Sequence, residues 1–259
     1  MKVLGGVFSL LIAIWIAWFL QFYIFDAVGV EWDVEKIGSW GDTFGALNAL
    51  FAALGFSAVL ITLWYQQRQI NEASEDQHRQ QFDRTFFQLL GLLREARGDV
   101  SYRYSASYRE KLDVQNSTTK IGADAFKEAA FEARFWIEKE MKIDSKMSKE
   151  DVGKLYTTKI HSRNESRFSP YFRMLYTILT KIKYDYILTD KEKHFYGNLV
   201  RSQMTSFESF IAGLNGLSSV SKDFSDLVTE FRLLKYIPNG ARKKILFKFY
   251  KEEAFLARD

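Results

Sequence analysis

Residues 43–65 read TFGALNALFAALGFSAVLITLWY, a run of 23 positions without a charged side chain. Residues 4–25 form a second uncharged run of 22 positions, LGGVFSLLIAIWIAWFLQFYIF. The hydrocarbon core of a bilayer is about 30 Å thick and takes about 20 helical residues to cross. Because lipid offers no hydrogen-bond partner to a bare backbone, a spanning segment must be helical. The two runs therefore predict a transmembrane hairpin over residues 1–65.

Each run has an alternative interpretation. Residues 4–25 could be a cleaved signal peptide, but the run exceeds the signal core of about 7–15 residues and no small-x-small cleavage site follows it. Residues 43–65 could be a buried core helix, but charged Asp42 and Arg68 flank a run of membrane-spanning length. Both alternatives are disfavoured, and the hairpin remains the prediction.

The charges around the two runs predict their orientation. The connector between them holds five acidic residues and a single basic one, Lys36. The outer flanks are basic: Lys2, Arg68, Arg79 and Arg84. Since positively charged flanks stay in the cytoplasm, we expect a multi-pass protein with both termini cytoplasmic and an acidic loop outside.

Small residues recur at every fourth position of the second span: Gly41, Gly45, Ala49, Ala53 and Ser57. On a helix this spacing makes one groove, which lets another helix approach closely. The groove could receive the first span of the same chain, or it could pair copies of the chain into a homo-oligomer.

Composition limits the chemistry of the rest of the chain. The absence of cysteine excludes disulfides, thiolate metal sites and a cysteine nucleophile. The whole chain carries a net charge of only +4, which is too small to indicate nucleic-acid binding. The 194 residues after residue 65 hold 34 basic and 27 acidic residues, a net charge of +7. This part is large enough for its own core and predicts a soluble domain.

Helical periodicity runs through that domain. Residues 66–81 are polar and rich in helix-forming residues, which predicts a solvated stalk that continues the second span. Apolar residues then return at helical spacing, at Phe82, Phe86, Leu89, Leu90 and Leu93, so the stalk helix of residues 66–97 enters a core there. No alternating strand pattern appears, and the prediction is an all-α chain with a cytoplasmic helical bundle at 98–259.

Further helices follow a polar, irregular segment at 98–122. We expect one at 123–142 and another at 149–162, the latter begun by Ser148 and Asp151. Pro170 is predicted to open the next helix, and Thr189 with Glu192 forms a capping box for a long helix ending near Leu214. The last two are expected at 222–236 and 241–257.

No pattern in the sequence identifies an enzyme. The three histidines, His78, His161 and His194, lie far apart and fit no zinc-protease motif. His161 and Glu165 have helical spacing, but such a lone pair is more typical of a surface contact than of a metal site. Phosphate-binding loops, dinucleotide motifs and serine nucleophile elbows are missing, so we expect no catalytic residue, no cofactor and no metal ion.

The carboxyl-terminal region is basic and amphipathic. Its cations are Arg242, Lys243, Lys244, Lys248 and Lys251, interleaved with apolar residues. This pattern is typical of a terminal helix that packs on the domain with a solvated lysine face. It would also suit anionic lipid, nucleic-acid phosphates or a partner protein; nucleic acid is not favoured.

A polar cluster interrupts the apolar pattern at Arg201, Ser202, Gln203, Met204 and Thr205, with Glu208 following. A buried arginine needs a partner, which Glu208 or a helix end could supply. The cluster indicates either a structural ion-pair network or a pocket for a ligand or partner.

Four segments occur in order and carry a family resemblance: Gly41-Asp42-Thr43-Phe44-Gly45, Phe82-Asp83-Arg84-Thr85-Phe86-Phe87-Gln88-Leu89-Leu90, Tyr171-Phe172-Arg173-Met174-Leu175-Tyr176, and Arg201-Ser202-Gln203-Met204-Thr205 before Glu208. Over residues 41–237 the chain resembles the AbiC-like phage abortive infection proteins, a family of bacterial membrane proteins. The resemblance implies anti-phage defence at the bacterial inner membrane and no established catalytic residue. The residues to consider for a partner or ligand are Tyr171, Phe172, Arg173, Tyr176, Arg201, Ser202, Gln203 and Glu208.

Three functions compete at this level. The first is a membrane-anchored defence sensor or effector whose helical domain recognises a phage product or a host protein and signals to the lipid bilayer. The second is a membrane-tethered nucleic-acid-binding protein or nuclease, and the third is a non-catalytic membrane scaffold for a partner protein.

Overall fold

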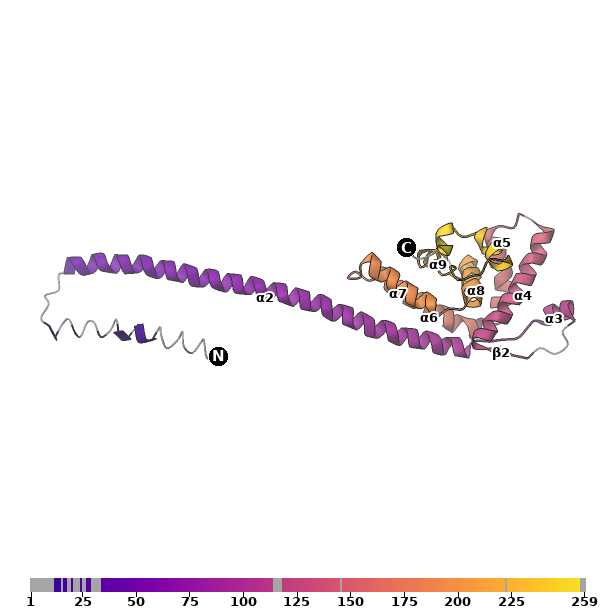
Figure 1. Cartoon of the computed structure of the whole chain (residues 1–259), viewed down its shortest axis with the longest axis horizontal. Helices are drawn as coiled ribbons and strands as arrows, with labels where there is room; N and C mark the ends of the chain where they lie inside the picture. The colour runs from indigo at the N-terminus through magenta and orange to yellow at the C-terminus, as the bar shows by residue number, and fades with distance from the viewer. Residues whose placement is uncertain are drawn as a thin grey trace. The chain divides into compact units, whose positions relative to one another are not determined.

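The computed structural model describes residues 12–14, 16–17, 20, 24, 27–28, 34–113, 118–144, 146–221 and 223–256, with side-chain surroundings given at residue 45 and from residue 48 onward within the later ranges. The chain divides into two compact units, Met1–Asn71 and Glu72–Asp259. The structure is 79% helix and 2% strand, which confirms the all-α prediction. Figure 1 labels most of the helices.

The first unit contains the residues of the predicted hairpin, 1–65. The predicted first span, residues 4–25, lies largely outside the described residues, so the hairpin and its orientation stay predictions. Helix α2, Val34–Asp99, contains the predicted second span and is uninterrupted by proline. Its part from Asn48 onward includes a stretch that is long and apolar enough to cross a membrane, and no residue of that stretch is buried inside the protein.

In the second unit, α2 becomes part of a core. Phe82, Phe86, Leu90 and Leu93 are buried at helical spacing, as predicted, while Leu89 is partly buried at the margin. Residues 66–77 are exposed, which agrees with the predicted polar stalk. The helix has no break at Gly91.

The segment 98–122 is more ordered than predicted. Strands β1, Ser101–Tyr102, and β2, Lys120–Ile121, pair antiparallel. Helix α3, Ala106–Leu112, lies between them in sequence. Ser105 caps α3 by accepting the Tyr108 N–H at 3.1 Å, and Asp113 ends it in the left-handed region at φ 53°. Seven residues are too few for periodicity to reveal a helix, and local capping forms it instead.

Helices α4, Gly122–Ile143, and α5, Lys149–Tyr156, occur where predicted. The capping box of Ser148 and Asp151 is present at the start of α5. A π-helical turn, η1 at Thr157–His161, continues α5.

The predicted start of the next helix is wrong. Helix α6 spans Glu165–Tyr184 and contains Pro170 instead of beginning there. The extra turn forms because Asn164 O accepts the N–H groups of Arg167 (2.9 Å) and Phe168 (3.0 Å), and because the Phe168 ring is fully buried. Burial of this aromatic side chain stabilises the turn despite the missing N–H of Pro170.

The predicted long helix ending near Leu214 is also wrong, because two helices occupy this stretch. Helix α7 spans Asp190–Ser202, and helix α8 spans Ser206–Leu217. The capping box of Thr189 and Glu192 starts α7 as predicted. A second capping box, of Thr205 and Glu208, starts α8, with Thr205 in the extended region. That box satisfies the first N–H groups of a new helix and so favours a break.

The last elements are shorter than predicted. A 3-10 turn, η2 at Ser219–Ser221, precedes α9, Phe224–Glu230, which ends six residues before the predicted end. Helix α10 covers only Ala241–Phe247, and a second 3-10 turn, η3 at Glu252–Phe255, follows it. The return of the chain onto the core ends α10, because the Leu234 N–H donates to Ala254 O at 3.2 Å.

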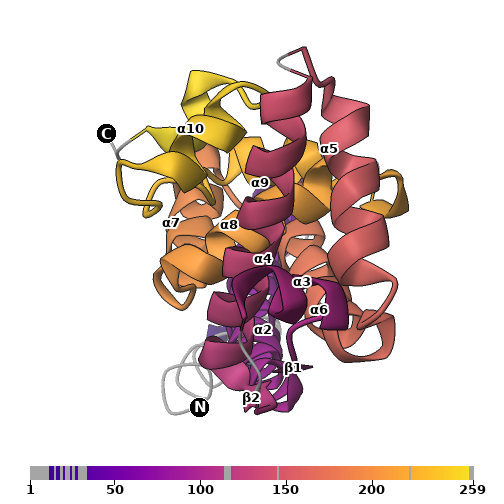
Figure 2. The ribbon, with the colours of Figure 1, turned by 90° about the vertical axis from the view of Figure 1, so that its right-hand side faces the viewer.

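Helix α8 lies at the centre of the second unit, packed against α4, α5, α9 and α10, and Figure 2 shows these helices around it. Every residue of α8 from Glu208 to Leu217 is buried. The approach of α5 is so close that a Cβ added to Gly153 would lie 2.1 Å from Leu217 O. Only glycine fits at this crossing.

We expect Gly153→Ala to lower the free energy of unfolding by about 2 kcal/mol, because the added methyl group meets rigid backbone. The matched control is Gly91→Ala. A Cβ at Gly91 meets nothing within 4 Å, so this exchange should stabilise α2 by about 0.5–1 kcal/mol. Thermal unfolding of the detergent-solubilised chain measures both. Equal melting temperatures for the two variants would contradict the packing described here.

Candidate functional site

Glu208 is fully buried and is the centre of a polar junction in the second unit. Its carboxylate accepts the Arg97 Nε–H at 3.0 Å and the Tyr171 hydroxyl at 2.9 Å on Oε2. The hydroxyl of Thr205 donates to the other oxygen, Oε1, at 3.0 Å. The side chain of Glu208 has no exposed surface. This carboxylate therefore joins α2, α6 and α8 at one point, which we call the Glu208 junction: Arg97, Tyr171, Gln203, Thr205 and Glu208.

The donors around Glu208 fit a buried carboxylate. Arg97 is 19% exposed and also donates from Nη2 to Gln203 O in the turn between α7 and α8. Burial and the nearby Glu208 raise the pKa of Tyr171 well above its usual value, so the phenol keeps its proton and remains a donor. A buried charge is tolerated when it is paired and hydrogen-bonded in this way.

The junction gathers only some of the residues predicted to form a site. Tyr171 and Glu208 contribute side chains, and Gln203 contributes its backbone carbonyl. Phe172 is buried beside Phe126 in the aromatic core. Three others lie on the surface: Arg173, Tyr176 and Ser202.

Arg201 occupies a different place. It is 2% exposed and donates from Nη1 to Arg232 O at 3.3 Å and from Nη2 to Asn198 Oδ1. The predicted partner of Arg201 was Glu208 or a helix end. The structure has the second, because Arg201 donates to backbone oxygens at the end of α9. Glu208 instead pairs with Arg97, a residue that the sequence did not single out.

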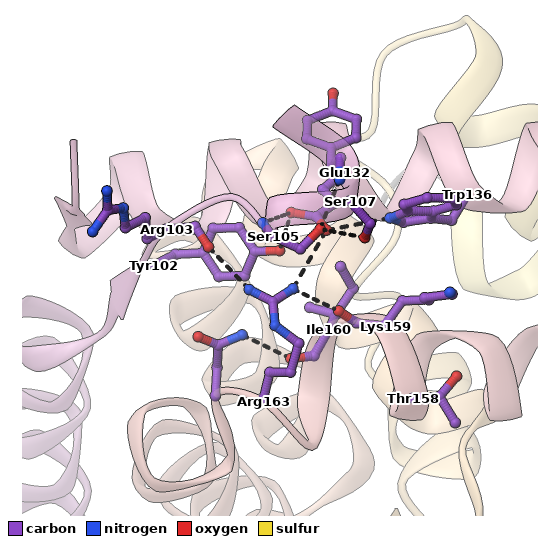
Figure 3. A network of polar contacts seen from close by, with 12 residues as sticks. Tyr102, Arg103, Ser105, Ser107, Glu132, Trp136, Thr158, Lys159, Ile160 and Arg163 are labelled. Atoms are coloured by element: carbon purple, nitrogen blue, oxygen red, sulfur yellow. Dashed lines mark hydrogen bonds and ion pairs between the residues drawn. The ribbon is translucent and has the colours of Figure 1, made fainter. Parts of the chain in front are cut away.

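A second buried carboxylate, Glu132 of α4, was not predicted. It accepts the Tyr102 hydroxyl at 2.8 Å, the Ser105 N–H at 3.0 Å and the Trp136 Nε1–H at 3.2 Å. Arg163 Nη1 lies 3.4 Å from Oε1. Figure 3 shows these side chains converging on Glu132 from α4, from β1 and the segment after it, and from the segment before α6.

The position of Glu132 in the helix contains a signal that could have identified it. Glu132 lies three residues after Ala129 and four before Trp136, on the face of α4 that the alanines bury. An acidic residue in phase with an apolar face predicts a buried, partnered charge. Arg97 offers no such signal, because its partner is distant in sequence.

Polar contacts also hold α2 where it enters the core. Tyr196 of α7 donates to Asp83, and burial with that contact raises the pKa of Tyr196. One turn earlier, Arg79 pairs with Glu192. His78 Nε2 lies 2.9 Å from Asp185 Oδ2. Together with the Glu208 junction, these contacts bind the last turns of α2 to α6, α7 and the turn before α8.

The remaining predicted residues do not meet in a site. Gly45, Ala49, Ala53 and Ser57 are exposed on α2, whereas the surroundings of Gly41 lie outside the described part. At the carboxyl end, Arg242 is half-buried with its guanidinium 4.0 Å from the centre of the Phe207 ring. Lys244, Lys248 and Lys251 are exposed, and Lys243 donates to Asn239 Oδ1 at 3.1 Å.

Within the described ranges, no three or more His, Asp or Glu side chains cluster in a way that could hold a metal ion. His161 is buried, and this burial lowers its pKa, although nearby Glu165 opposes the shift. Glu165 itself is exposed and accepts the Ser169 hydroxyl at 3.2 Å.

We expect Arg97→Met to lower the free energy of unfolding by about 3–5 kcal/mol, because it leaves the Glu208 carboxylate buried without its cation. Adding Glu208→Gln should recover part of that loss. The control is Arg134→Met, which removes a partly exposed pair with Glu138 at 3.8 Å and should cost about 1 kcal/mol or less. Urea unfolding of the four proteins gives the values. A loss for Arg97→Met no larger than that of the control would contradict a buried junction.

Residues 163–241 match the family model described as "Putative phage abortive infection protein". No curated protein and no solved structure matches the chain. The match is narrower than the predicted span of residues 41–237, but it includes the Tyr171–Tyr176 segment, the Arg201–Thr205 segment and Glu208. The family resemblance predicted from the sequence is thereby confirmed: residues 163–241 carry the sequence pattern of a phage abortive infection protein family.

Proposed function

We propose that this protein is a membrane-anchored anti-phage protein. Its cytoplasmic helical domain senses a phage product or a host protein and passes the signal to the membrane through α2. The family match supports a role in abortive infection. Membrane anchoring, the two-span topology with cytoplasmic termini and the recognition of a partner are the proposed parts.

The observation that carries the proposal is that two parts of α2 have different surroundings: one exposes apolar side chains, and the other packs into the core. The stretch from Leu50 to Tyr65 exposes large apolar side chains such as Leu54, Phe56 and Val59, each more than half exposed. A surface of this kind is costly in water and suited to lipid. Near the end of the same helix, Arg97 pairs with Glu208. Glu208 lies within residues 163–241, which match the family model.

The Glu208 junction gives the signal a physical route. Glu208 caps α8, the helix at the centre of the domain, and Arg97 connects that cap to α2. A partner that alters the turn between α7 and α8 would change the environment of Gln203 O and of Glu208. Because the buried Glu208 carboxylate needs the Arg97 guanidinium as its partner, a change at Glu208 would move Arg97 and with it the end of α2.

A fractionation experiment tests the anchoring. The full chain, expressed in bacteria, should sediment with membranes, resist an alkaline wash and dissolve only in detergent. The variant Leu54→Lys/Val59→Lys should also lose phage protection at equal protein level, since each lysine near the centre of a span costs about 2.5–3.5 kcal/mol.

The matched control places the same charges in the polar part of α2, as Gln69→Lys/Gln77→Lys, where both side chains are exposed. It should protect cells as the unchanged chain does. Recovery of the unchanged chain in the supernatant without detergent would refute the anchoring. Full protection by Leu54→Lys/Val59→Lys would refute the role of α2 in the membrane.

A further inference from the structure

Two arginines from different helices lie near each other beside α8. Arg134 belongs to α4 and Arg242 to α10, and both helices pack against α8. Burial and the nearby Arg134 guanidinium lower the pKa of Arg242. Farther along the same two segments, Lys248 Nζ lies 4.0 Å from Met141 Sδ. We call this line of contact the α4–α10 seam: Arg134, Glu138, Met141, Arg242 and Lys248.

The Arg242 guanidinium is held in place but lacks an anionic partner. Its Cζ atom lies 4.0 Å from the centre of the Phe207 ring, and that ring packs edge-on against Phe131 of α4 with 5.6 Å between the ring centres. Contact with an aromatic face restricts the orientation of a guanidinium. Among the described residues, no acceptor meets the buried Nη1 group of Arg242 and no carboxylate pairs with this side chain. A fixed set of donors without a protein acceptor suits an anion from outside the chain.

Arg134 is only weakly satisfied by the protein. The Glu138 carboxylate lies 3.8 Å from Arg134 Nε, which is beyond hydrogen-bond distance, and Nε has no acceptor in the part of the chain that the structure describes. The side chains of Arg134 and Glu138 are 41% and 42% exposed, so water screens their attraction. The exposed part of the Arg134 side chain can therefore meet a ligand.

The charges of the seam favour an anion with two negative charges. Arg134, Arg242 and Lys248 stand against the single carboxylate of Glu138, which leaves a net charge of +2. Two cations held near each other repel, and an anion between them removes that cost. A phosphate monoester carries about −1.5 to −2 charges at pH 7 and has three acceptor oxygens. Because a guanidinium donates two parallel hydrogen bonds to such oxygens, one phosphate can engage both arginines.

We propose that the α4–α10 seam binds a phosphate monoester group, with Arg134 and Arg242 as the residues that donate to its oxygens. Phe207 holds Arg242 in position, and Glu138 weakens the binding by repulsion. The bound phosphate bridges α4 to α10. This binding does not depend on the membrane role of α2. A soluble phosphate ester and the headgroup of phosphatidic acid share this chemistry, and the experiment distinguishes them.

Phosphorus NMR on the full chain in a maltoside detergent tests the site at neutral pH, since it detects weak binding. The probes, titrated separately, are glycerol 3-phosphate, dihexanoyl phosphatidic acid and dimethyl phosphate. The stronger-binding monoester should exceed dimethyl phosphate, which carries one charge, by about tenfold or more. Glycerol 3-phosphate binding at least as tightly as the lipid identifies a soluble ester, and tighter binding of the lipid identifies a headgroup. The site is refuted if neither monoester binds, or if dimethyl phosphate binds as tightly as the monoesters.

The variant Arg242→Met keeps an unbranched side chain beside Phe207 and removes the guanidinium. It should weaken monoester binding by about tenfold or more, because it removes charge-assisted hydrogen bonds. The matched control is Lys244→Met, which removes a positive charge from an exposed position of the same helix and should weaken binding by about twofold or less. An equal loss in the two variants would indicate diffuse attraction to a basic surface and would overturn the assignment.

A gain of binding tests the seam without relying on a loss. Glu138→Gln removes the negative charge beside Arg134 and should tighten monoester binding by about threefold. The control Glu140→Gln removes an acidic charge from another face of α4 and should leave the affinity unchanged. A variant that merely disturbs folding would not bind more tightly. Unchanged or weaker binding in Glu138→Gln would contradict the role of Arg134.

Discussion

The ion pair between Arg97 and Glu208 connects the end of α2 to the buried core of the second unit. Glu208 has no exposed surface, so its charge must be met inside the protein. Three elements meet it: Arg97 from α2, Tyr171 from α6 and Thr205 from the turn before α8. Because α8 packs against α4, α5, α9 and α10, the position of Glu208 depends on the whole bundle. The interaction therefore fixes the end of α2 to the core of the helical bundle.

Local signals in the sequence predicted many of the helices but not the breaks. The pairs Ser148–Asp151 and Thr189–Glu192 identify helix starts, and the structure contains both capping boxes. The pair Thr205–Glu208 has the same pattern and was passed over, because apolar residues continue on both sides of it. Pro170 wrongly predicted a helix start, because burial of Phe168 adds a helical turn before the proline. Local capping favours the break at Thr205, whereas tertiary burial of Phe168 adds the turn before Pro170.

The candidate site was less predictable than the helices. Tyr171 and Glu208 were recognised as a polar group of the family pattern, yet the cation that joins them, Arg97, follows no pattern and is found only when distant segments meet. Arg201 was expected to pair with Glu208 or with a helix end, and it donates to the backbone oxygens of Phe231 and Arg232 at the end of α9. The left-handed backbone of Arg232 has no sequence signature, because glycine would normally mark that position.

Hydrogen exchange on the full chain, followed by mass spectrometry, tests the central claim most directly. The account holds that the last turns of α2 and the start of α8 open together, because Arg97 and Glu208 share one buried junction. In Arg97→Met, amides of residues 86–97 and of residues 208–212 should therefore exchange faster by a similar factor. Faster exchange confined to α2, with the start of α8 unchanged, would contradict the account.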